Sequence, residues 1–553
     1  MPGATAQTLY PFLWRASKLF PDREIVARTH EGMRRRTYAD YAGRVAQLAG
    51  ALEATGVESG DRVATFCWNH DRHFETYFAI PNMGAQLHTI NPLLPDHHVQ
   101  YIVENADDRV LFVDQSFLEK VEAAHDPDAF ASVEQYVVMG STTPETSLEP
   151  VTDYESYVAD QPADYDWPDL SGDQPAGLCY TSGTTGKPKG VEYTQQMLWA
   201  HTMATLPATG LDITADDVVM PVVPMFHVNA WGLPFSATAV GAKHVYPGPA
   251  PDPADLASLI ESEGVTLTAG VPTVWLGLLE YVDEHDVDLS SLDRIVIGGS
   301  AAPESVIRRF DELGVDVIHA WGMTETSPIG TVSNLKPGMD EWDPERQYAK
   351  RGKQGLFVPG LEFRVLDENG EEVPWDGEAF GELLVRGPWV ATEYFERPDA
   401  TAASYEDGWL RTGDVVTVDE DGYMEIVDRT SDVIKSGGEW ISSVELENAL
   451  MAHDDVSEAT VIGVPHERWQ ERPVAFVVPQ EGVDQESLKG TLVSTIAEEY
   501  PEWWAPDEVV FVDEVPKTAT GKFDKKVLRE RYGDESLVEG KAPDEAAPED
   551  ADD

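Results

Sequence analysis

The sequence predicts an α/β protein, with a large N-terminal domain of layered, largely parallel sheets and helices and a small α+β C-terminal domain. The chain has 553 residues, more than one hydrophobic core usually holds. Short apolar runs alternate with helical patterns along most of it, which is typical of parallel strands joined by helices. Near Asp428 the pattern changes to a unit of about 100 residues. We therefore expect domains at residues 1–428 and 429–533.

The elements of the large domain follow from periodicity. Val45, Leu48 and Leu52 share a helix face that ends at Gly56. Further elements are expected as an apolar helix at 74–83 and as strands at 63–67, 110–113, 295–297 and 315–318. Because ligand loops of parallel sheets follow the carboxyl ends of strands, functional residues are expected after these strands.

The sequence of the small domain predicts a different mixture of elements. They are helices at 444–451 and 488–500 and strands at 459–462, 474–478 and 509–512. After Gly533 the composition becomes acidic and rich in Pro and Ala, so residues 534–553 are expected to be a disordered tail.

The charge of the chain is extreme. Its 39 basic and 100 acidic residues give a formal net charge of −61, and a phosphate backbone would be repelled, so nucleic-acid binding is excluded on bulk charge. The tail alone does not account for this balance, because Asp and Glu occur throughout. Molar salt screens such repulsion within about 3 Å. We therefore interpret the charge as an adaptation to a halophilic cytoplasm.

Cysteine usage and apolar segments exclude two other classes of protein. Cys67 and Cys179 are the only cysteines and lie in apolar runs, so buried thiols are expected rather than disulfides. The N-terminus, residues 1–14, lacks the basic start and following apolar stretch that indicate a signal peptide. Residues 218–242 lack charged side chains, but three prolines argue against a membrane helix and favour a buried strand and pocket wall.

One short loop carries most of the chemistry. Residues 180–191 read Tyr-Thr-Ser-Gly-Thr-Thr-Gly-Lys-Pro-Lys-Gly-Val. Glycines let backbone N–H groups approach an anion, hydroxyls add hydrogen bonds and lysines add charge, so a polyphosphate is the favoured ligand. The spacing is not that of a Walker A motif, because Gly183 is only two residues from Gly186-Lys187 and Pro188 follows.

The loop resembles the phosphate loop of the adenylate-forming superfamily, which includes acyl-CoA synthetases, luciferases and peptide-synthetase adenylation domains. The resemblance implies that ATP phosphates contact Thr181, Ser182, Gly183, Thr185, Gly186 and Lys187, and that Thr184 serves catalysis and the metal. Further motifs of the family follow in order along nearly the whole chain, from about Thr37 to Lys526.

Residues 319–326 resemble the Tyr-Gly-x-Thr-Glu motif of the family, with Trp321 in place of the tyrosine. The resemblance implies that Glu325 holds Mg²⁺, Thr324 contacts phosphate and Trp321 stacks on adenine, beside Gly322 and Met323. An adenine wall is implied at Gly299, Ser300 and Ala301, although Ser300 reads equally well as the cap of a helix.

Two motifs flank the predicted domain change. Asp414, in a Thr-Gly-Asp motif, resembles the family's ribose ligand, and Arg429 would meet the same ribose. The family places a hinge at residues 428–432, which makes the small domain mobile, with Ser431 or Asp432 absorbing the rotation. The face expected to meet coenzyme A contains Lys435, Gly437, Gly438 and Trp440.

Lys522 resembles the catalytic lysine of the family's last motif. Two anions, a carboxylate and the α-phosphate, must meet during adenylation, and a mobile ammonium neutralises the growing charge. A solvated basic turn with Lys525 and Lys526 is the bland alternative, and it is weakened by the scarcity of lysine in this chain.

The acyl pocket follows the pattern of the fatty acyl-CoA synthetase branch. Residues 224–232 resemble its acyl loop, in which His227 borders the acyl-adenylate and Trp231 gates the acyl tunnel. A lone histidine in an apolar run is otherwise most often a packed core residue. The pocket lining implied by the resemblance is His227, Val228, Asn229, Trp231, Gly270, Pro272 and Thr273.

Together the motifs predict an ATP- and CoA-dependent, Mg²⁺-requiring ligase for medium- or long-chain fatty acids that acts through acyl-AMP. The nearest alternative is a CoA ligase for an aryl, short-chain or methylthio acid. Luciferase-like oxidation, a carrier-loading domain and a non-catalytic nucleotide sensor are further alternatives. The branch also implies a possible homodimer without a membrane span.

Overall fold

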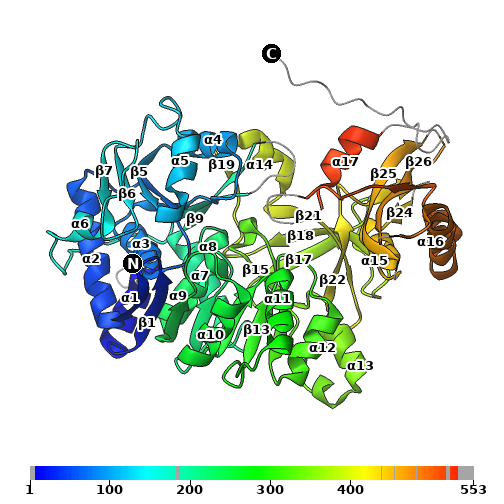
Figure 1. The fold of residues 1–553 in the computed structure, drawn as a ribbon, viewed down its shortest axis with the longest axis horizontal. Coiled ribbons are helices and arrows are strands. Elements are labelled where there is room, and N and C mark those ends of the chain that lie inside the picture. The colour runs from blue at the N-terminus through cyan, green and yellow to red at the C-terminus, as the bar shows by residue number, and fades with distance from the viewer. Residues whose placement is uncertain are drawn as a thin grey trace.

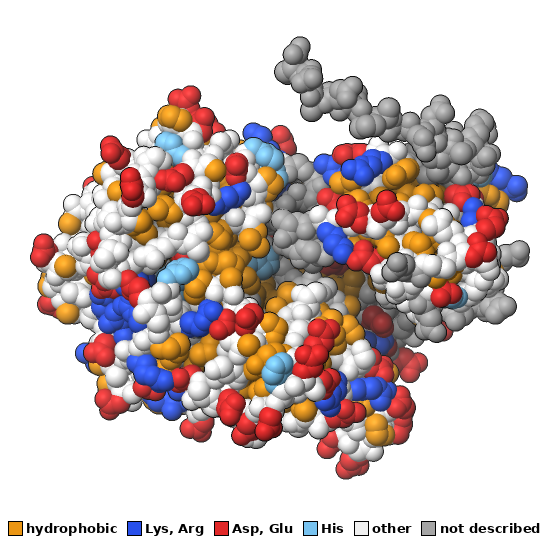
Figure 2. Space-filling view, in the orientation of Figure 1, with side chains coloured by type: hydrophobic (Ala, Val, Ile, Leu, Met, Phe, Trp, Pro, Cys, Tyr) orange, Lys and Arg blue, Asp and Glu red, His pale blue; other side chains and the backbone are white. Residues whose placement is uncertain are grey.

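The computed structural model describes residues 6–181, 187–436, 439–453, 455–466, 468–480, 482–517 and 523–533. Outside this part lie the predicted tail at 534–553 and the predicted site residues Ser182, Gly183, Thr184, Thr185, Gly186, Gly437, Gly438 and Lys522. In Figure 1 the last elements of the chain lie together at one side of a larger body. Figure 2 shows Asp and Glu side chains spread over the visible face of both parts.

The first large sheet has nine strands with a parallel centre and antiparallel edges. From β1 through β11, β10, β12 and β13 to β14 each strand is parallel to the next, whereas β2 at one edge and β15 and β16 at the other are antiparallel to their neighbours. The strands are β1 (Glu24–Thr29), β2 (Gly32–Thr37), β10 (Val218–Pro221), β11 (Lys243–Tyr246), β12 (Leu267–Gly270), β13 (Arg294–Ile297), β14 (Asp316–Gly322), β15 (Ile329–Val332) and β16 (Leu356–Phe357).

The second large sheet has eight strands and repeats this design. Five adjacent pairs are parallel, and β9 and β19 add an antiparallel edge next to β8. The strands are β3 (Arg62–Phe66), β4 (Gln86–Thr89), β5 (Asp108–Val113), β6 (Gln135–Val138), β7 (Val151–Asp153), β8 (Pro175–Tyr180), β9 (Gly190–Thr194) and β19 (Tyr394–Phe395). The prediction of layered, largely parallel sheets is confirmed for both.

Helix α3 (Asp71–Asn82) lies in the core between these two sheets. All its residues are buried, and it contacts β1 of one sheet and β4 and β8 of the other. Because a helix enclosed on all sides cannot be amphipathic, its polar residues need partners inside the protein. The other helices of this part are α1 (Tyr10–Leu19), α2 (Tyr38–Ala54), α4 (Asp96–Ala106), α5 (Leu118–Ala124), α6 (Tyr154–Val158), α7 (Gln195–Thr205), α9 (Leu233–Val240), α10 (Pro253–Glu263), α11 (Pro272–Glu284), α12 (Glu304–Glu312) and α13 (Pro344–Arg351).

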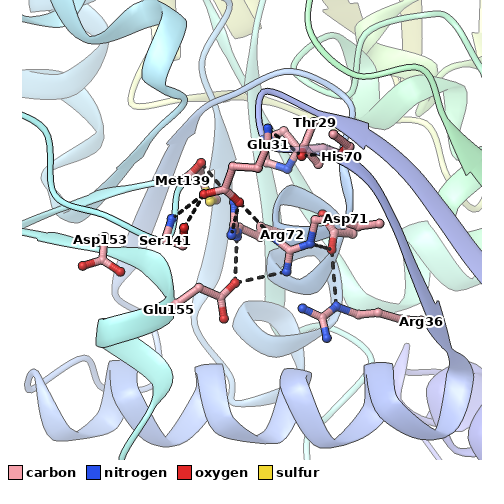
Figure 3. A network of polar contacts seen from close by, with 12 residues as sticks. Thr29, Glu31, Arg36, His70, Asp71, Arg72, Met139, Ser141, Asp153 and Glu155 are labelled. Carbon is pink, nitrogen blue, oxygen red and sulfur yellow. Dashed lines mark hydrogen bonds and ion pairs between the residues drawn. The ribbon is translucent and has the colours of Figure 1, made fainter.

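An ion-pair network supplies partners for α3 (Figure 3). Arg72 Nη2 donates to Glu31 Oε2 at 2.9 Å, and its Nε donates to Glu155 Oε1 at 2.9 Å. Glu31 also accepts a hydrogen bond from the Ser141 backbone N–H at 2.9 Å. The network therefore ties the β1–β2 hairpin, the loop after β6 and α6 to the buried helix.

A third sheet, antiparallel throughout its five strands, was not foreseen in the sequence. It consists of β17 (Glu362–Leu366), β18 (Phe380–Arg386), β20 (Tyr405–Glu406), β21 (Trp409–Val418) and β22 (Met424–Arg429). Helix α14 (Pro398–Ser404) precedes β20. The long strand β21 carries Asp414 at its middle.

The C-terminal elements form the predicted α+β unit. Its sheet contains β23 (Ile434–Ser436), β24 (Glu439–Ile441), β25 (Val456–His466), β26 (Gln470–Pro479) and β27 (Glu508–Phe511). Its helices are α15 (Ser443–Met451), α16 (Gln485–Glu499) and α17 (Lys525–Tyr532). The domain limits at 428 and 533 remain predictions.

The uncharged segment at 218–242 is only partly a strand. Strand β10 ends at Pro221, and the rest contains the short turn α8 (Val228–Trp231) and the buried helix α9, so the expectation of a strand was wrong for its second half. Pro234 lies in the first turn of α9, where its missing N–H has no intrahelical partner to lose. Within the described residues, no helix is both long and apolar enough to cross a bilayer.

Candidate active site

The phosphate loop leaves β8 and returns along β9. Its base is closed by a hydrogen bond from the Thr181 backbone N–H to the Lys189 carbonyl at 2.9 Å. Cys179 of β8 is buried, as is Cys67 directly after β3 of the same sheet, which confirms the prediction of buried free thiols. The loop therefore emerges from the carboxyl end of a strand in the sheet centre, as expected for a ligand loop.

Both lysines of the loop lie on aromatic rings. Lys187 Nζ is 4.5 Å from the centroid of Tyr101, and Lys189 Nζ is 4.2 Å from that of Tyr394. Lys187 is exposed and Lys189 is half-buried. Burial lowers the pKa of Lys189, and the Glu325 carboxylate opposes that shift. Both cations are thus held near the base of the loop.

Glu325 lies in the turn η2 (Thr324–Thr326), directly after β14. Its side chain is buried, and its Oε1 accepts a hydrogen bond from the Tyr394 hydroxyl at 2.6 Å. Burial first, and then the Glu325 charge, raises the pKa of Tyr394 well above its usual value, so this phenol is a donor. The Tyr193 hydroxyl of β9 donates to the Thr324 carbonyl at 2.8 Å. The turn is therefore joined to the strand that follows the phosphate loop.

Asp414 is buried on β21 and meets two predicted site residues. Trp321 Nε1 donates to Asp414 Oδ2 at 2.9 Å, and Arg429 Nε lies 2.7 Å from Asp414 Oδ1. Trp321 is itself nearly buried, and its ring packs over Gly330. The replacement of the family's tyrosine therefore gives this chain an indole N–H that orients the candidate ribose ligand.

An apolar pocket opens beside these groups at the carboxyl ends of β13 and β14. Gly298 lies between the Ala320 carbonyl and the Trp231 ring, where an added Cβ would be 3.0 and 3.2 Å away. Gly322 at the end of β14 also lines the pocket. The remaining lining residues are Leu211, Val296, Gly299, Trp321, Pro328 and Ile329. The predicted adenine wall and acyl gate thus border one hollow.

The acyl loop has an unusual backbone. Val228, Asn229, Ala230 and Trp231 all have positive φ, from 45° to 55°. A left-handed conformation costs about 1–2 kcal/mol for each non-glycine residue, and such strain gathers at functional sites. His227, just before this turn, is exposed rather than packed in the core. Gly270, at the end of β12, contacts the buried Trp275 indole, whose Nε1 donates to the Gly270 carbonyl at 3.1 Å.

The predicted pocket residues at the start of α11 have mixed exposure. Pro272 is buried, whereas Thr273 and the preceding Val271 are exposed. Met323 is half-buried between Trp321 and the Glu325 turn.

The small unit contacts the third sheet across the predicted hinge. The Trp440 ring stacks on Phe380 of β18 with centroids 5.9 Å apart. Asp428 Oδ2 accepts from the Ser443 backbone N–H at 2.6 Å, and burial raises the pKa of this carboxyl. Lys435 is exposed. Trp440 thus packs on protein in this arrangement and not on an open face.

One structural interpretation of the adenine wall was wrong. Helix α12 begins at Glu304 with Pro303 at its N-cap and no side-chain cap, so Ser300 is not a capping residue. Ser300 and Ala301 are exposed in the loop after β13. Gly299 there has φ +80°, a value that favours glycine. The loop is therefore shaped by its glycine and not by a cap.

Tyr394 and Lys189 were missing from the predicted site residues. Lys189 stood inside the phosphate loop, so its lysine character was the available signal. Tyr394 lies 69 positions from Glu325, and no local pattern marks it. Its pairing with Val191 through the β19–β9 ladder is a tertiary contact that spacing does not reveal.

Comparison with known proteins identifies the family. The model described as AMP-binding enzyme matches residues 13–395, and that of the AMP-binding enzyme C-terminal domain matches residues 445–522. The chain belongs to the AMP-binding enzyme family. The predicted resemblance to adenylate-forming enzymes is thereby confirmed.

Relatives resemble this family member over their whole length. It is 47% identical over 527 residues to a long-chain-fatty-acid–CoA ligase of Thermus thermophilus, covering 95% of each chain. It is 43% identical over 524 residues to a 3-methylmercaptopropionyl-CoA ligase of Ruegeria lacuscaerulensis, covering 94% of this chain and 96% of that one. The crystal structure of an anthranilate CoA ligase in complex with anthranoyl-AMP superposes with a TM-score of 0.81 at 28% identity, covering 96% and 98% of the two chains.

Proposed function

We propose that this family member is an AMP-forming acid–thiol ligase that activates a medium- or long-chain fatty acid with ATP and transfers the acyl group to coenzyme A. One observation carries the proposal. Hydrogen bonds join Tyr193 of β9 to the Thr324 carbonyl, and Trp321 to Asp414, so the phosphate-loop strand, the Glu325 turn and the candidate ribose ligand form one site. The similarity to the fatty acid ligase of Thermus thermophilus supports the substrate class.

In the first half-reaction the fatty carboxylate attacks the α-phosphate of ATP, giving acyl-AMP and pyrophosphate. Asp414 would accept hydrogen bonds from the ribose hydroxyls, with its carboxylate already oriented by Trp321 and Arg429. The apolar pocket behind Gly298 would hold the acyl chain next to the reacting phosphate. Positioning and charge neutralisation are the main contributions to phosphoryl-group chemistry.

Mg²⁺ fits the residues around Glu325. This cation prefers hard oxygen ligands and uses one or two carboxylates when phosphates supply the rest. Glu325 is one buried carboxylate with Oε1 bound by a phenol, and no described residue hydrogen-bonds its Oε2. Within the described ranges, no group of three or more His, Cys, Asp or Glu residues could hold a metal without such help. When bound, the cation would neutralise phosphate charge.

The second half-reaction requires the small domain to move. We infer that a rotation at 428–432 separates Arg429 from Asp414 and Trp440 from Phe380, and brings the Lys435 face towards the acyl-AMP. Lys522, which lies outside the described residues, would serve only the first half. The thiol of coenzyme A then displaces AMP from the acyl carbonyl.

A panel of acids tests the substrate class. ATP- and CoA-dependent pyrophosphate release should increase from acetate towards octanoate and palmitate, measured as kcat/KM. Lys522→Ala should abolish acyl-AMP formation and spare thioester formation from supplied acyl-AMP. Equal loss of both steps would contradict the alternation of the small domain, and no CoA-dependent turnover with any acid would contradict the ligase.

A methylthio acid is the second candidate substrate. The 43% identity to a 3-methylmercaptopropionyl-CoA ligase favours it specifically. Including 3-methylthiopropionate in the panel separates the two, because a short acid buries less apolar surface in the pocket than octanoate does. A higher kcat/KM for this acid than for octanoate would replace the fatty acid proposal.

We also propose that the enzyme works in a salt-rich cytoplasm. A net charge of −61 destabilises a compact fold through self-repulsion unless salt screens it. The melting midpoint should rise steadily between 0.1 and about 3 M KCl as the Debye length falls to about 3 Å or less. A midpoint already maximal in dilute buffer would contradict this adaptation. Sedimentation at the same salt concentrations tests the homodimer that the resemblance implies.

A further inference from the structure

Glu325 is held from two sides by one segment of chain that the proposed mechanism does not yet use. The Ala391 backbone N–H donates to the Glu325 carbonyl at 2.8 Å. Three residues later the Tyr394 hydroxyl donates to the carboxylate Oε1 at 2.6 Å. Just before them, the Trp389 carbonyl accepts from Ser327 Oγ at 2.7 Å. Backbone and side chain of the turn are thus fixed by the same segment, 389–394.

The same segment also reaches the base of the phosphate loop. Tyr394 pairs with Val191, and Phe395 pairs with Gly190, in the antiparallel ladder between β19 and β9. The Tyr394 ring lies under the Lys189 ammonium at 4.2 Å. Tyr394 is only 5% exposed, and its backbone N–H donates to Thr401 Oγ1 at 2.9 Å, so its ring has little freedom to move.

We propose that Tyr394 is the positioning residue of Glu325. Its hydroxyl fixes Oε1 and thereby leaves Oε2 as the carboxylate oxygen available to the cation that accompanies ATP. This inference rests on the proposed role of Glu325 as a Mg²⁺ ligand. A carboxylate free to rotate would present either oxygen, whereas a short charge-assisted bond from a buried phenol selects one orientation. Partners that orient a metal ligand in this way tune the affinity of the metal.

The arrangement around Tyr394 also sets the distance between two ends of the site. The ring contacts Lys189 of the phosphate loop, and the hydroxyl contacts Glu325. One rigid aromatic side chain therefore spans from a loop cation to the candidate metal ligand. A phenylalanine would keep the ring and its contact with Lys189 but release the carboxylate.

Tyr193 is a matched control that tests whether Tyr394 has only a structural role. Both are buried phenols that donate one hydrogen bond to the Glu325 turn, but Tyr193 bonds the Thr324 backbone carbonyl at 2.8 Å and not a carboxylate. Loss of either hydroxyl leaves one polar atom of the turn without its partner. Only the loss at Tyr394 should change how the protein responds to Mg²⁺.

The experiment measures ATP binding by calorimetry without acid or coenzyme A, across a series of Mg²⁺ concentrations. Tyr394→Phe should weaken the Mg²⁺-dependent part of ATP binding about 10-fold and leave Mg²⁺-free binding unchanged, because second partners of metal ligands contribute 10–100-fold to metal affinity. Tyr193→Phe should leave the Mg²⁺ midpoint unchanged. Tyr394→Phe should add nothing further in a Glu325→Gln background. Thermal melting confirms that each variant folds.

The outcomes separate this inference from the proposed function. Equal effects of Tyr394→Phe with and without Mg²⁺, an effect no larger than that of Tyr193→Phe, or a full additional loss in the Glu325→Gln background would each overturn the positioning role alone. If the ATP affinity of the wild-type protein did not depend on Mg²⁺, both the assignment of Glu325 as a Mg²⁺ ligand and the inference about Tyr394 would be overturned.

Discussion

Two buried glutamates of this protein each accept a hydrogen bond from a tyrosine hydroxyl, but their other neighbours differ. Glu75 on α3 accepts a hydrogen bond from the Tyr154 hydroxyl at 2.5 Å, and Glu325 accepts one from Tyr394 at 2.6 Å. Glu75 also receives Arg44 Nε at 3.1 Å, whereas in the described part of the chain no Lys, Arg or His lies within 4 Å of the Glu325 carboxylate. A buried carboxylate needs a compensating cation. Glu75 has such a cation inside the fold, and the absence of one this close to Glu325 among the described residues agrees with the metal-binding role proposed for it.

The surroundings of Glu75 extend this contrast. In the network of Figure 3, Arg72 joins Glu31 to Glu155, so neighbouring carboxylates also have internal cations. An acidic chain has few basic residues to place, 39 in all, and it places several of them around α3. The comparison therefore contrasts a carboxylate paired inside the fold with one for which we propose a role in the reaction.

The largest effect is expected when the internal ion pair of Arg44 and Glu75 is broken. Arg44→Met keeps the volume of the side chain but leaves Glu75 buried without its closest cation. The free energy of unfolding should fall by about 3 kcal/mol, since removal of one partner of a buried pair typically costs 3–5 kcal/mol. Urea unfolding measures this change. At temperatures well below the melting midpoint this variant should retain ligase activity. A large loss of kcat with unchanged stability would contradict a structural role for the pair of Arg44 and Glu75.

The second effect belongs to Glu325. Glu325→Gln should lower kcat for pyrophosphate release about 100-fold, the size expected when one preorganised charge is removed from a reacting phosphate site. Its stability should change little, because no described Lys, Arg or His lies within 4 Å of this carboxylate. Glu75→Gln is the matched control, with the opposite pattern of lower stability and intact chemistry. The comparison fails if both variants affect the same quantity.

A smaller effect is expected at the third buried carboxylate, Asp414. Trp321→Phe removes the indole N–H from Asp414 and keeps an aromatic ring. The KM for ATP should rise about 10-fold, because a hydrogen bond to a charged group contributes about 1.5–3 kcal/mol. Steady-state kinetics at saturating acid measure it. Phe357→Leu disturbs the packing of the same indole without touching the N–H, so an equal rise in that variant would assign the effect to packing.

The smallest effect appears in the pH dependence of stability. Hydrogen bonds from Ser141 and Arg72 overcome the burial of Glu31 and lower its pKa to about 2, and the charge of Arg44 does the same for Glu155. Because these values are depressed from 4.5, the contribution is present above about pH 4.5 and is lost as the pH falls through 2. The difference in melting midpoint between wild type and Arg72→Met should therefore shrink between pH 5 and pH 2. A constant difference would show that Arg72 acts through packing instead.

Local patterns predicted the elements well and the site in part. Apolar periodicity predicted strands such as β3 and β13 and helix α2. Composition predicted the hydroxyl- and glycine-rich loop after β8. The antiparallel third sheet did not, because strand direction depends on pairing and not on composition. The left-handed turn at 228–231 was equally hidden, since β-branched and aromatic residues there disfavour positive φ.

The sequence by itself determined the α/β class, the phosphate loop, the acidic surface and the family of this protein, because each depends on composition or on residues adjacent along the chain. Only the tertiary structure decided which buried glutamate is neutralised, that Trp321 binds Asp414, and that Tyr394 joins Glu325 to the phosphate-loop strand. The reason is physical. Whether a buried charge has a partner depends on which strands and helices pack beside it, and those neighbours come from segments tens to hundreds of residues away.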